Sequence, residues 1–511
     1  GGLAGGCANR GEDAAGSAAG AGLRMASVFS DHMVLQRSDA TPMWGWTAPR
    51  ARVVVRASWG DRLATRADRQ GWWRVDLDTP EAGGPFELRI SSGGAERVFR
   101  DVMVGEVWLA AGQSNMEWPL QGRANGAVNG SESAIAGSAD SLLRMYTAER
   151  SFSGDPQEDV PGGWQVSSPE TAGGFSAVGY FFARGLRREL GVPVGIVHTS
   201  WGGTPIESWM PIDVLESVPG MEGVRARFDS SRAATERYRA WEAAAALADT
   251  SSSVATAPAP EPPPSDDLLG HRSPSVLYNA MIHPLLSYGI RGAIWYQGES
   301  NVWDPPLYAE LFPAMIQAWR ERWGQGVLPF YYVQIAPYDY DGARDELSPW
   351  LRHAQTETLD RVSETGMTVT MDIGDPGNIH PAEKFEVGRR LSLLALAGAY
   401  GREEVVASGP RYAGFDVDGA QAVVRFTSAP GGLRSPDATV SHVELAGPDG
   451  RFVPARAEID GDRLRVSAPG VERPAAIRYA WNDTAATNLF NAEGLPAVPF
   501  HSGSWEAYEP R

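Results

Sequence analysis

The sequence predicts an α/β protein in which a mostly parallel sheet is flanked by two β-rich domains. Two observations carry this prediction. Between residues 105 and 404, buried strand-like runs alternate with amphipathic helical runs, the order that βαβ units require. Over 23–104 and 405–511, short β-branched and aromatic runs are separated by Gly, Pro and Asp, as in β-sandwich-type domains.

Five short apolar runs of the central region are predicted as buried strands. They are EVWLAA (106–111), VGIVHT (194–199), IRGAIWY (290–296), FYYVQI (330–335) and MTVTMD (367–372). A helix is predicted from the cap at Ser176 to Leu190, where Gly191 ends it. A second helix is predicted after His380, because apolar residues recur there on one face.

The flanking regions carry the β signals. The N-terminal one, a predicted small β-sandwich, contains TPMWGW (41–46), RVVVR (52–56) and GWWRVDL (71–77). The C-terminal one contains AVVRF (422–426) and RLRV (463–466). A Pro/Ser/Ala-rich run over 249–268 interrupts the central region, and we expect it to form an exposed excursion.

Composition excludes several classes of function. The net charge is −18, from 63 acidic and 45 basic residues, whereas nucleic-acid binding relies on a basic surface. Cys7 is the only cysteine, which excludes internal disulfides and Cys-based zinc sites. No apolar run reaches the roughly 18 residues of a membrane-spanning helix.

Residues 1–22 are predicted to be a flexible tether. Small residues precede Cys7 and a Gly/Ala/Ser-rich stretch follows it, which resembles the end of a bacterial lipoprotein signal, although Leu3 stands one place too far from Cys7. We expect an exported bacterial protein, periplasmic or on the outer surface, whose membrane contact is a lipid anchor at Cys7. The alternative is a disordered N-terminus with an incidental cysteine.

Open parallel sheets place their sites beyond the carboxyl ends of the strands, so the residues that follow each predicted strand are the candidates for chemistry. Ser114 follows the first strand in a Gly-containing turn, which exposes a hydroxyl nucleophile beside a free backbone N–H; a helix-capping serine is the alternative. Gly202 and Gly203 follow the second, where a glycine N–H can point at an oxyanion; a plain strand-to-loop turn is the alternative.

The later strands add an amide, acids and a base. Gln297 and Glu299 follow the third strand: the amide can donate to an oxyanion, and the carboxylate can orient a histidine or pair with an arginine; a loop held by its own hydrogen bonds is the alternative. Asp375 and His380 lie in the loop after the last strand, which suits a general base and its orienting acid. Lys384 is the only lysine in the chain, and a helix would place it on the same face as His380. A compact ammonium needed at that position, or chance, would explain it.

Taken together, these segments resemble the SGNH-hydrolase superfamily and, within it, the sialate O-acetylesterase-like carbohydrate esterases. The similarity runs from about residue 25 to 505 and rests on an ordered set of strings. They are VFSDHMVLQR (28–37), WLAAGQSNMEWP (108–119), TSWGGTPIESW (199–209), LYNAMIHPL (277–285), AIWYQGESN (293–301), GDPGNIHPAEK (374–384), RYAWND (478–483) and NLFNAEGLPAVPF (488–500).

The resemblance implies a flavodoxin-like α/β/α domain and an esterase that removes O-acetyl groups from sugars without a metal or cofactor. By position, Ser114 is the nucleophile and His380 the general base. The oxyanion donors would be the Ser114 N–H, a glycine N–H and the Gln297 side chain. The glycine would be Gly202 or Gly203. We expect Asn115 to be a further oxyanion-binding or substrate-binding residue.

The third member of the triad departs from the family pattern. Many SGNH enzymes place Asp three residues before the histidine, but Gly377 stands there, and Asn378 stands two residues before it. An asparagine lacks the negative charge that stabilises an imidazolium. We expect Asp375 to supply the acid, with Glu299 as the second candidate.

The expected partner is an acetylated glycan, either a plant-wall polymer such as xylan or xyloglucan or an O-acetylated sialic acid. The second hypothesis is a catalytically silent sugar-binding protein that uses its β domains, because the acid near His380 is missing from its usual place.

Overall fold

The computed structural model describes residues 22–37, 40–250, 264–265, 267–340, 346–503 and 505–508. Cys7, the predicted tether up to residue 21 and most of the predicted 249–268 excursion lie outside these ranges.

The centre of the molecule is a mostly parallel sheet, as predicted. Its strand order is β10-β9-β11-β8-β12-β13-β14, and every neighbouring pair from β9 to β14 is parallel, while β10 pairs with β9 antiparallel. The bounds are β8 (Ala95–Gly112), β9 (Asp140–Ala148), β10 (Gly162–Ser167), β11 (Val194–Ser200), β12 (Gly292–Tyr296), β13 (Phe330–Val333) and β14 (Thr365–Thr368). The chain builds one side of the sheet through β11 and then crosses to β12, so the order reverses beside β8.

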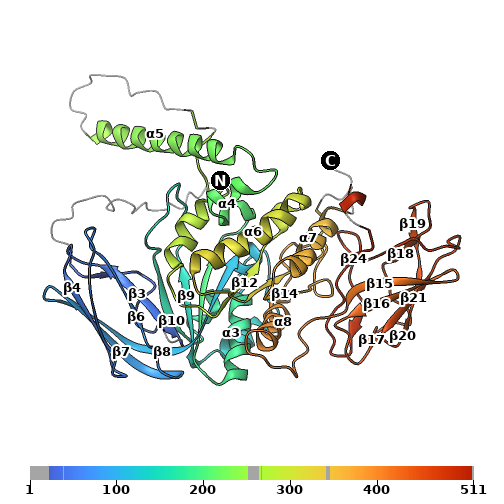
Figure 1. Ribbon diagram of the computed structural model, residues 1–511, viewed down its shortest axis with the longest axis horizontal. Coiled ribbons are helices and arrows are strands. Elements are labelled where there is room, and N and C mark those ends of the chain that lie inside the picture. Colours follow the sequence, from blue (N-terminus) through green and yellow to red (C-terminus); the bar gives the residue numbers. More distant parts are fainter. Residues whose placement is uncertain are drawn as a thin grey trace.

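Helices cover both faces of this sheet (Figure 1). On one side lie α3 (Ala177–Leu190) and α8 (Lys384–Ala397), and on the other α6 (Pro305–Trp323) and α7 (Leu347–Arg361). Alternate residues of β8 point to opposite faces. Trp108 packs in the core between the sheet and α3 and α8, and Leu109 packs in the core on the side of α6 and α7. The α/β/α arrangement is therefore confirmed.

The boundaries of α3 follow from its caps. The Ser176 hydroxyl accepts the N–H of Gly179 at 3.0 Å, and Gly191 ends the helix in the left-handed region at φ 69°. Both residues act as predicted from the sequence.

The N-terminal β region is joined to the central sheet through β8. A three-stranded sheet contains β1 (Arg24–Met25), β3 (Thr41–Trp46) and β6 (Trp72–Leu77). The strands that join the first half of β8, directly or through a neighbour, are β2 (Val34–Gln36), β4 (Arg52–Ala57), β5 (Arg62–Arg66) and β7 (Gly83–Ser92). The predicted strand 106–111 is thus the second half of an 18-residue strand, and the predicted boundary at 104/105 falls inside it.

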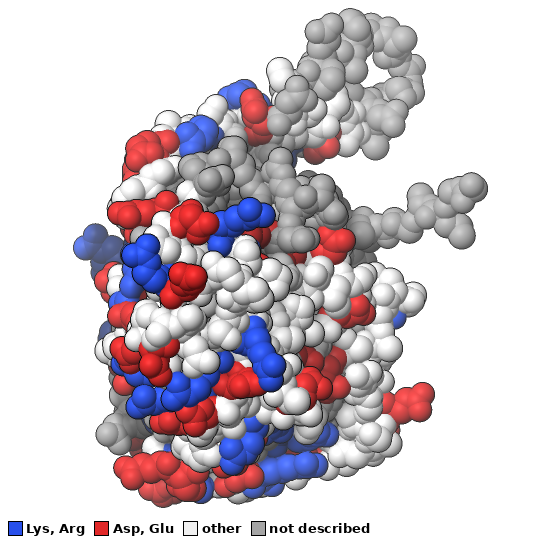
Figure 2. Space-filling view, turned by 90° about the vertical axis from the view of Figure 1, so that its right-hand side faces the viewer, with Lys and Arg blue, Asp and Glu red and all other residues white. Residues whose placement is uncertain are grey.

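The C-terminal β region contains two four-stranded antiparallel sheets and a short two-stranded one. Their strands are β15 (Arg411–Asp418), β16 (Gln421–Thr427), β17 (Leu433–Arg434), β18 (Val443–Ala446), β19 (Phe452–Pro454), β20 (Arg456–Asp460), β21 (Arg463–Ser467), β22 (Ala476–Tyr479), β23 (Phe490–Asn491) and β24 (Phe500–His501). On the side of the molecule that carries these sheets, basic and acidic side chains are interspersed (Figure 2).

The remaining helices and helical turns complete the described part of the chain. They are α1 (Ser114–Glu117), α2 (Ser131–Ala136), α4 (Ile212–Ser217), the longer α5 (Val224–Thr250), and the turns η1 (Ala172–Gly174), η2 (Ile206–Trp209), η3 (Tyr278–Ile282), η4 (His283–Leu285), η5 (Glu299–Asn301) and η6 (Trp505–Ala507). Within the described ranges, no helix combines the length and the apolar character needed to cross a membrane.

Candidate active site

Ser114 lies just beyond the end of β8, beside which the strand order of the sheet reverses. Gly112 ends β8 at φ 143°, and a Cβ there would lie 2.2 Å from the Tyr296 carbonyl oxygen of β12. The close approach of the two strands therefore requires glycine. Gln113 follows, its N–H donating to the same carbonyl at 2.9 Å, and α1 begins at Ser114. The hydroxyl is thus at the carboxyl edge of the sheet, at the switch point where open α/β sheets bind ligands.

His380 reaches Ser114 from the loop between β14 and α8. Its Nε2 lies 2.9 Å from Ser114 Oγ. Its own backbone N–H donates to Asn378 Oδ1 at 2.9 Å, and its ring stacks on Trp118 at a centroid distance of 4.3 Å and 24°. The structure therefore brings together the predicted nucleophile and the predicted base.

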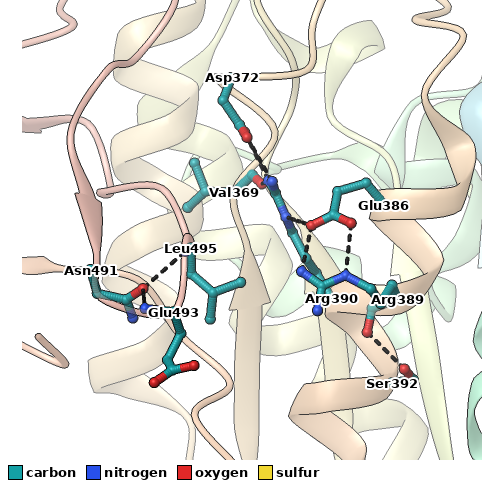
Figure 3. Close-up of polar contacts among 9 residues, drawn as sticks. All are labelled: Val369, Asp372, Glu386, Arg389, Arg390, Ser392, Asn491, Glu493 and Leu495. Atoms are coloured by element: carbon teal, nitrogen blue, oxygen red, sulfur yellow. Dashed lines mark hydrogen bonds and ion pairs between the residues drawn. The ribbon is translucent and has the colours of Figure 1, made fainter. Parts of the chain in front are cut away.

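The start of the His380 loop is anchored by Arg390 of α8 (Figure 3). The buried guanidinium donates to the Val369 carbonyl at 2.6 Å and to both carboxylate oxygens of Asp372 at 2.8 and 2.6 Å. It also donates to Glu386 at 2.8 Å. Bidentate Arg–carboxylate pairs have a fixed geometry, so this cluster holds the loop against α8.

Neither predicted orienting acid contacts the imidazole. Asp375 is exposed, and its Oδ1 accepts the N–H of Gly377 at 2.9 Å in a local turn. Glu299 is 6% exposed, and its Oε1 accepts Asn115 Nδ2 at 2.6 Å. Among the described residues, no hydrogen bond or ion pair joins either carboxylate to His380. The contact expected from the sequence is absent because each carboxylate is held by another partner.

The predicted oxyanion donors are only partly available. Gly202 lies beside the nucleophile, since a Cβ on it would be 3.2 Å from Ser114 Cβ, but its N–H donates to Glu117 Oε2 at 2.5 Å. Gly203 is the next residue, at φ 73°. As the first residue of α1, Ser114 has no acceptor for its N–H inside the helix.

Two other predicted binding residues belong to the interior. Gln297 is fully buried, and its amide donates to Asn301 Oδ1 at 2.7 Å and to the Thr204 carbonyl at 3.3 Å. Asn115 is also fully buried, and both ends of its amide are hydrogen-bonded. Both side chains are therefore engaged in hydrogen bonds within the interior and are not exposed to a ligand.

The chain is similar over most of its length to known acetylesterases. It is 32% identical over 427 residues to the sialate O-acetylesterase of Rattus norvegicus, which covers 77% of this chain and 76% of that protein. The Homo sapiens sialate O-acetylesterase is 32% identical over 428 residues, covering 77% and 74%. The family model described as carbohydrate esterase, sialic acid-specific acetylesterase matches residues 270–393. The chain belongs to this sialate O-acetylesterase family of carbohydrate esterases.

The structure agrees with the family assignment. A carbohydrate acetylesterase from Xanthomonas citri, solved by crystallography, matches with a TM-score of 0.80 and 37% identity, covering 94% of this chain and 100% of that one. The predicted resemblance and the predicted fold class are therefore both confirmed.

Glu117 is a site residue of this esterase that the sequence analysis did not single out. Its Oε1 accepts Arg123 Nη2 at 2.5 Å and Arg150 Nη1 at 3.2 Å, while Oε2 holds the Gly202 N–H. The carboxylate thus connects the loop after β11, which contains Gly202, to the helix that begins at Ser114. Glu117 stands three residues after Ser114 in the same sequence motif, and this position is the signal that could have identified it.

An aromatic surface adjoins Gly202. The ring of Trp201 stacks on His271 at a centroid distance of 4.8 Å and 13°, and the guanidinium of Arg150 lies 5.4 Å from the Trp201 ring. Arg150 and His271 come from loops with no recognisable pattern, so only the folded chain shows that they meet.

The surroundings of His380 favour its neutral form. Burial, together with the positive charges of Lys384 and Arg123, lowers the pKa of His380 to about 4, and Glu117 opposes this shift. An imidazole that is neutral at pH 7 can accept a proton from a serine hydroxyl. Among the described residues, no cluster of three or more His, Cys, Asp or Glu side chains is arranged to hold a metal ion.

Proposed function

We propose that this carbohydrate esterase removes O-acetyl groups through an acetyl-serine intermediate on Ser114. The observation that carries the proposal is the 2.9 Å contact between Ser114 Oγ and the His380 Nε2 at the switch point of the sheet. It supports nucleophilic catalysis because a neutral imidazole in hydrogen-bond reach of a hydroxyl activates that hydroxyl.

In the first half-reaction, Ser114 Oγ attacks the acetyl carbonyl carbon while His380 Nε2 takes the hydroxyl proton. The tetrahedral intermediate collapses, and the sugar oxygen leaves with the proton from His380. In the second half-reaction, water gives a proton to the same nitrogen and attacks the acetyl-serine. Acetate leaves, and the proton returns to Ser114 Oγ.

The oxyanion donors that we propose are the N–H groups of Ser114 and Gly203. Both glycines follow β11 beside the nucleophile, but the N–H of Gly202 is held by Glu117. Loss of one such donor typically costs about 3 kcal/mol of transition-state stabilisation. The Gln297 amide, which the family resemblance suggested as a donor, is engaged with Asn301 instead.

The proposed triad is reduced to a dyad. In place of an acid on Nδ1, three contacts orient the ring: the stacking on Trp118, the hydrogen bond with Ser114 and the backbone hydrogen bond to Asn378. The low pKa of His380, about 4, is consistent with the absence of a carboxylate hydrogen-bonded to the imidazole, because the negative charge of Glu117 opposes the shift only in part.

We propose that the sugar that carries the acetyl group packs on Trp201, next to Gly202. The partly exposed ring offers an apolar face, and Arg150 beside it offers hydrogen-bond donors. The glycan is a plant-wall polymer such as xylan or xyloglucan, or an O-acetylated sialic acid. We also propose, from the sequence alone, that the enzyme is exported and anchored through Cys7.

The test measures acetate released from acetylated xylan, xyloglucan, pectin and O-acetylated sialic acid. We expect release from at least one glycan and a loss of roughly 10⁴-fold or more in Ser114→Ala, because Ser114 carries the covalent step. Ser217→Ala is the matched control, since that exposed hydroxyl only donates to the Val214 carbonyl at 2.7 Å. No release by the wild type would favour the silent sugar-binding protein, whose retention on the same glycans would then be measured.

A further inference from the structure

A chain of three buried polar side chains lies behind the Ser114–His380 pair. Lys384, Asn115 and Glu299 are 1%, 0% and 6% exposed. Lys384 Nζ donates to Asn115 Oδ1 at 2.5 Å, and Asn115 Nδ2 donates to Glu299 Oε1 at 2.6 Å. The proposed chemistry uses neither the ammonium nor the carboxylate directly.

The Asn115 amide connects the two halves of the active site. Asn115 follows Ser114 in α1, and its Nδ2 also donates to the carbonyl of Ile379, the residue before His380, at 3.0 Å. One side-chain amide therefore links the backbone of the nucleophile to the backbone of the base.

The two charged neighbours determine how that amide is oriented. An ammonium can only donate hydrogen bonds, and an ionised carboxylate can only accept them. When Lys384 is protonated and Glu299 is ionised, Asn115 must turn Oδ1 to the lysine and Nδ2 to the glutamate. That orientation is the one in which Nδ2 also reaches the Ile379 carbonyl.

Burying two charges is expensive, and a buried pair is often replaceable by neutral residues at no loss of stability. Here the carboxylate even keeps one oxygen, Glu299 Oε2, without a partner among the described residues. Burial raises the pKa of Glu299 and lowers the pKa of Lys384 to about 7. Stability alone does not account for such an arrangement.

We propose that Lys384 and Glu299 are positioning residues: they fix the orientation of the Asn115 amide, and through it they hold His380 at hydrogen-bonding distance from Ser114. The proposal rests on the proposed function, in which Ser114 and His380 react. It also gives a role to the only lysine of the chain.

The charges around the base give Lys384 a second, measurable effect. The groups that act on His380 are the positive Lys384 and Arg123 and the negative Glu117. Glu299 faces Lys384, and the Tyr296 ring lies 5.7 Å from its Nζ. Replacing Lys384 by a neutral residue removes one of the two positive charges, so His380 should become protonated at a higher pH.

The kinetic test compares Lys384→Met, Glu299→Gln and the double variant. We expect each single variant to lower kcat roughly 10- to 100-fold with KM within about twofold, because a misplaced base affects the chemical step. Lys384→Met should also move the acid limb of kcat/KM to higher pH. Arg402→Gln is the control: this guanidinium pairs with Glu404 at 3.6 Å and is not among the groups that act on His380, so the acid limb should stay in place and kcat should stay within about threefold of the wild type.

The double variant separates positioning from a purely structural role. It removes both buried charges together, so we expect it to recover thermal stability relative to the single variants. The amide of Asn115 is then no longer forced into one orientation, so kcat should stay low. Recovery of wild-type kcat in the double variant would overturn the proposal, as would an unchanged kcat and pH profile in Lys384→Met.

A spectroscopic test does not depend on turnover. Because Lys384 is the only lysine, labelling the full chain with 13C/15N-lysine gives one side-chain NMR signal. We expect this signal to titrate near pH 7 and to move to lower pH in Glu299→Gln, since Glu299 favours the charged amine. A titration near the ordinary lysine value of about 10.4 that ignores Glu299→Gln would overturn the arrangement. The expected signal in an inactive wild type would instead count against the proposed function alone.

Discussion

His380 is oriented without a carboxylate on its second ring nitrogen. The ring has Trp118 on one face and Ser114 on Nε2, and its backbone N–H is held by Asn378. In the serine triads, the aspartate supplies both orientation and charge. Here orientation comes from stacking and backbone contacts, so no carboxylate is needed on Nδ1.

This arrangement makes a prediction for Asp375. Its carboxylate is exposed and holds the Gly377 N–H, so Asp375→Asn keeps an acceptor in the same turn. We expect kcat on an acetylated substrate to stay within about threefold of the wild type, whereas loss of a true triad acid costs about 10⁴-fold. A loss approaching that size would restore Asp375 as the orienting acid and refute the dyad.

The pH profile tests the electrostatics of the base. His380 must be neutral to accept the serine proton, so activity falls as the pH drops through its pKa. Because burial, Lys384 and Arg123 lower that pKa to about 4, the acid limb of kcat/KM should lie near pH 4, well below the ordinary histidine value of about 6.5. The rates should be measured between pH 3.5 and 8, with circular dichroism to exclude acid unfolding. A limb near pH 6.5 would contradict the environment described for His380.

At the residue scale, the sequence pointed to Ser114 and His380, which the structure places 2.9 Å apart, but it did not predict the surroundings of this pair. Ser114 and His380 follow strands and stand in family strings, so position and resemblance agreed. The orienting acid was expected at Asp375 because histidines of this type usually have one nearby in sequence. In the structure that carboxylate accepts a hydrogen bond within a local turn instead. No pattern in the sequence distinguishes a carboxylate that contacts the histidine from one that is held in its own turn.

At the scale of elements, the loop after β11 is set by its contact with α1. Gly202 packs against Ser114, and Glu117 of α1 holds its N–H. The carboxylate of Glu117 is itself held by Arg123 and Arg150. These contacts hold the loop close to the helix that begins at Ser114.

Gly202→Ala tests that separation. The added methyl would lie 3.2 Å from Ser114 Cβ and 3.2 Å from Glu117 Oε2, closer than ordinary contact, so one neighbour must shift. We expect kcat/KM to fall roughly 10- to 100-fold, because the shift displaces the nucleophile or the oxyanion loop. Gly163→Ala on β10 is the control, since nothing lies within 4 Å of its Cβ position. Equal activity in the two variants would show that the loop moves freely.

The element boundaries show where sequence patterns stop being informative. The caps at Ser176 and Gly191 gave α3 its limits, because local hydrogen bonds set them. The predicted strand 367–372 is instead β14, Thr365–Thr368. Beyond it, the Val369 carbonyl accepts from Arg390 and the Thr370 hydroxyl donates to the Gln334 carbonyl, so side chains of distant residues end the ladder.

At the scale of the whole molecule, the regional organisation was predictable and the junction was not. Strand periodicity and turn residues separated β-rich flanks from the α/β centre. The change of rhythm near residue 105 was interpreted as a boundary, but it marks where a continuous strand passes into a fully buried environment. From residue 102 onward every residue of β8 is buried, whereas its first seven residues are partly or fully exposed.

The continuity of β8 also constrains how this protein can change during evolution. Residues 103–105 pair with β2, residues 106–112 pair with β11 and residues 108–112 also pair with β12, so one strand sets the register on both sides of the junction. A single-residue insertion that is not taken up by a β-bulge would turn every following side chain to the opposite face and displace Ser114. Recombination between related genes can therefore exchange the N-terminal region only where the crossover preserves the length of this strand. The N-terminal β region and the position of Ser114 are thus coupled through the length of one strand.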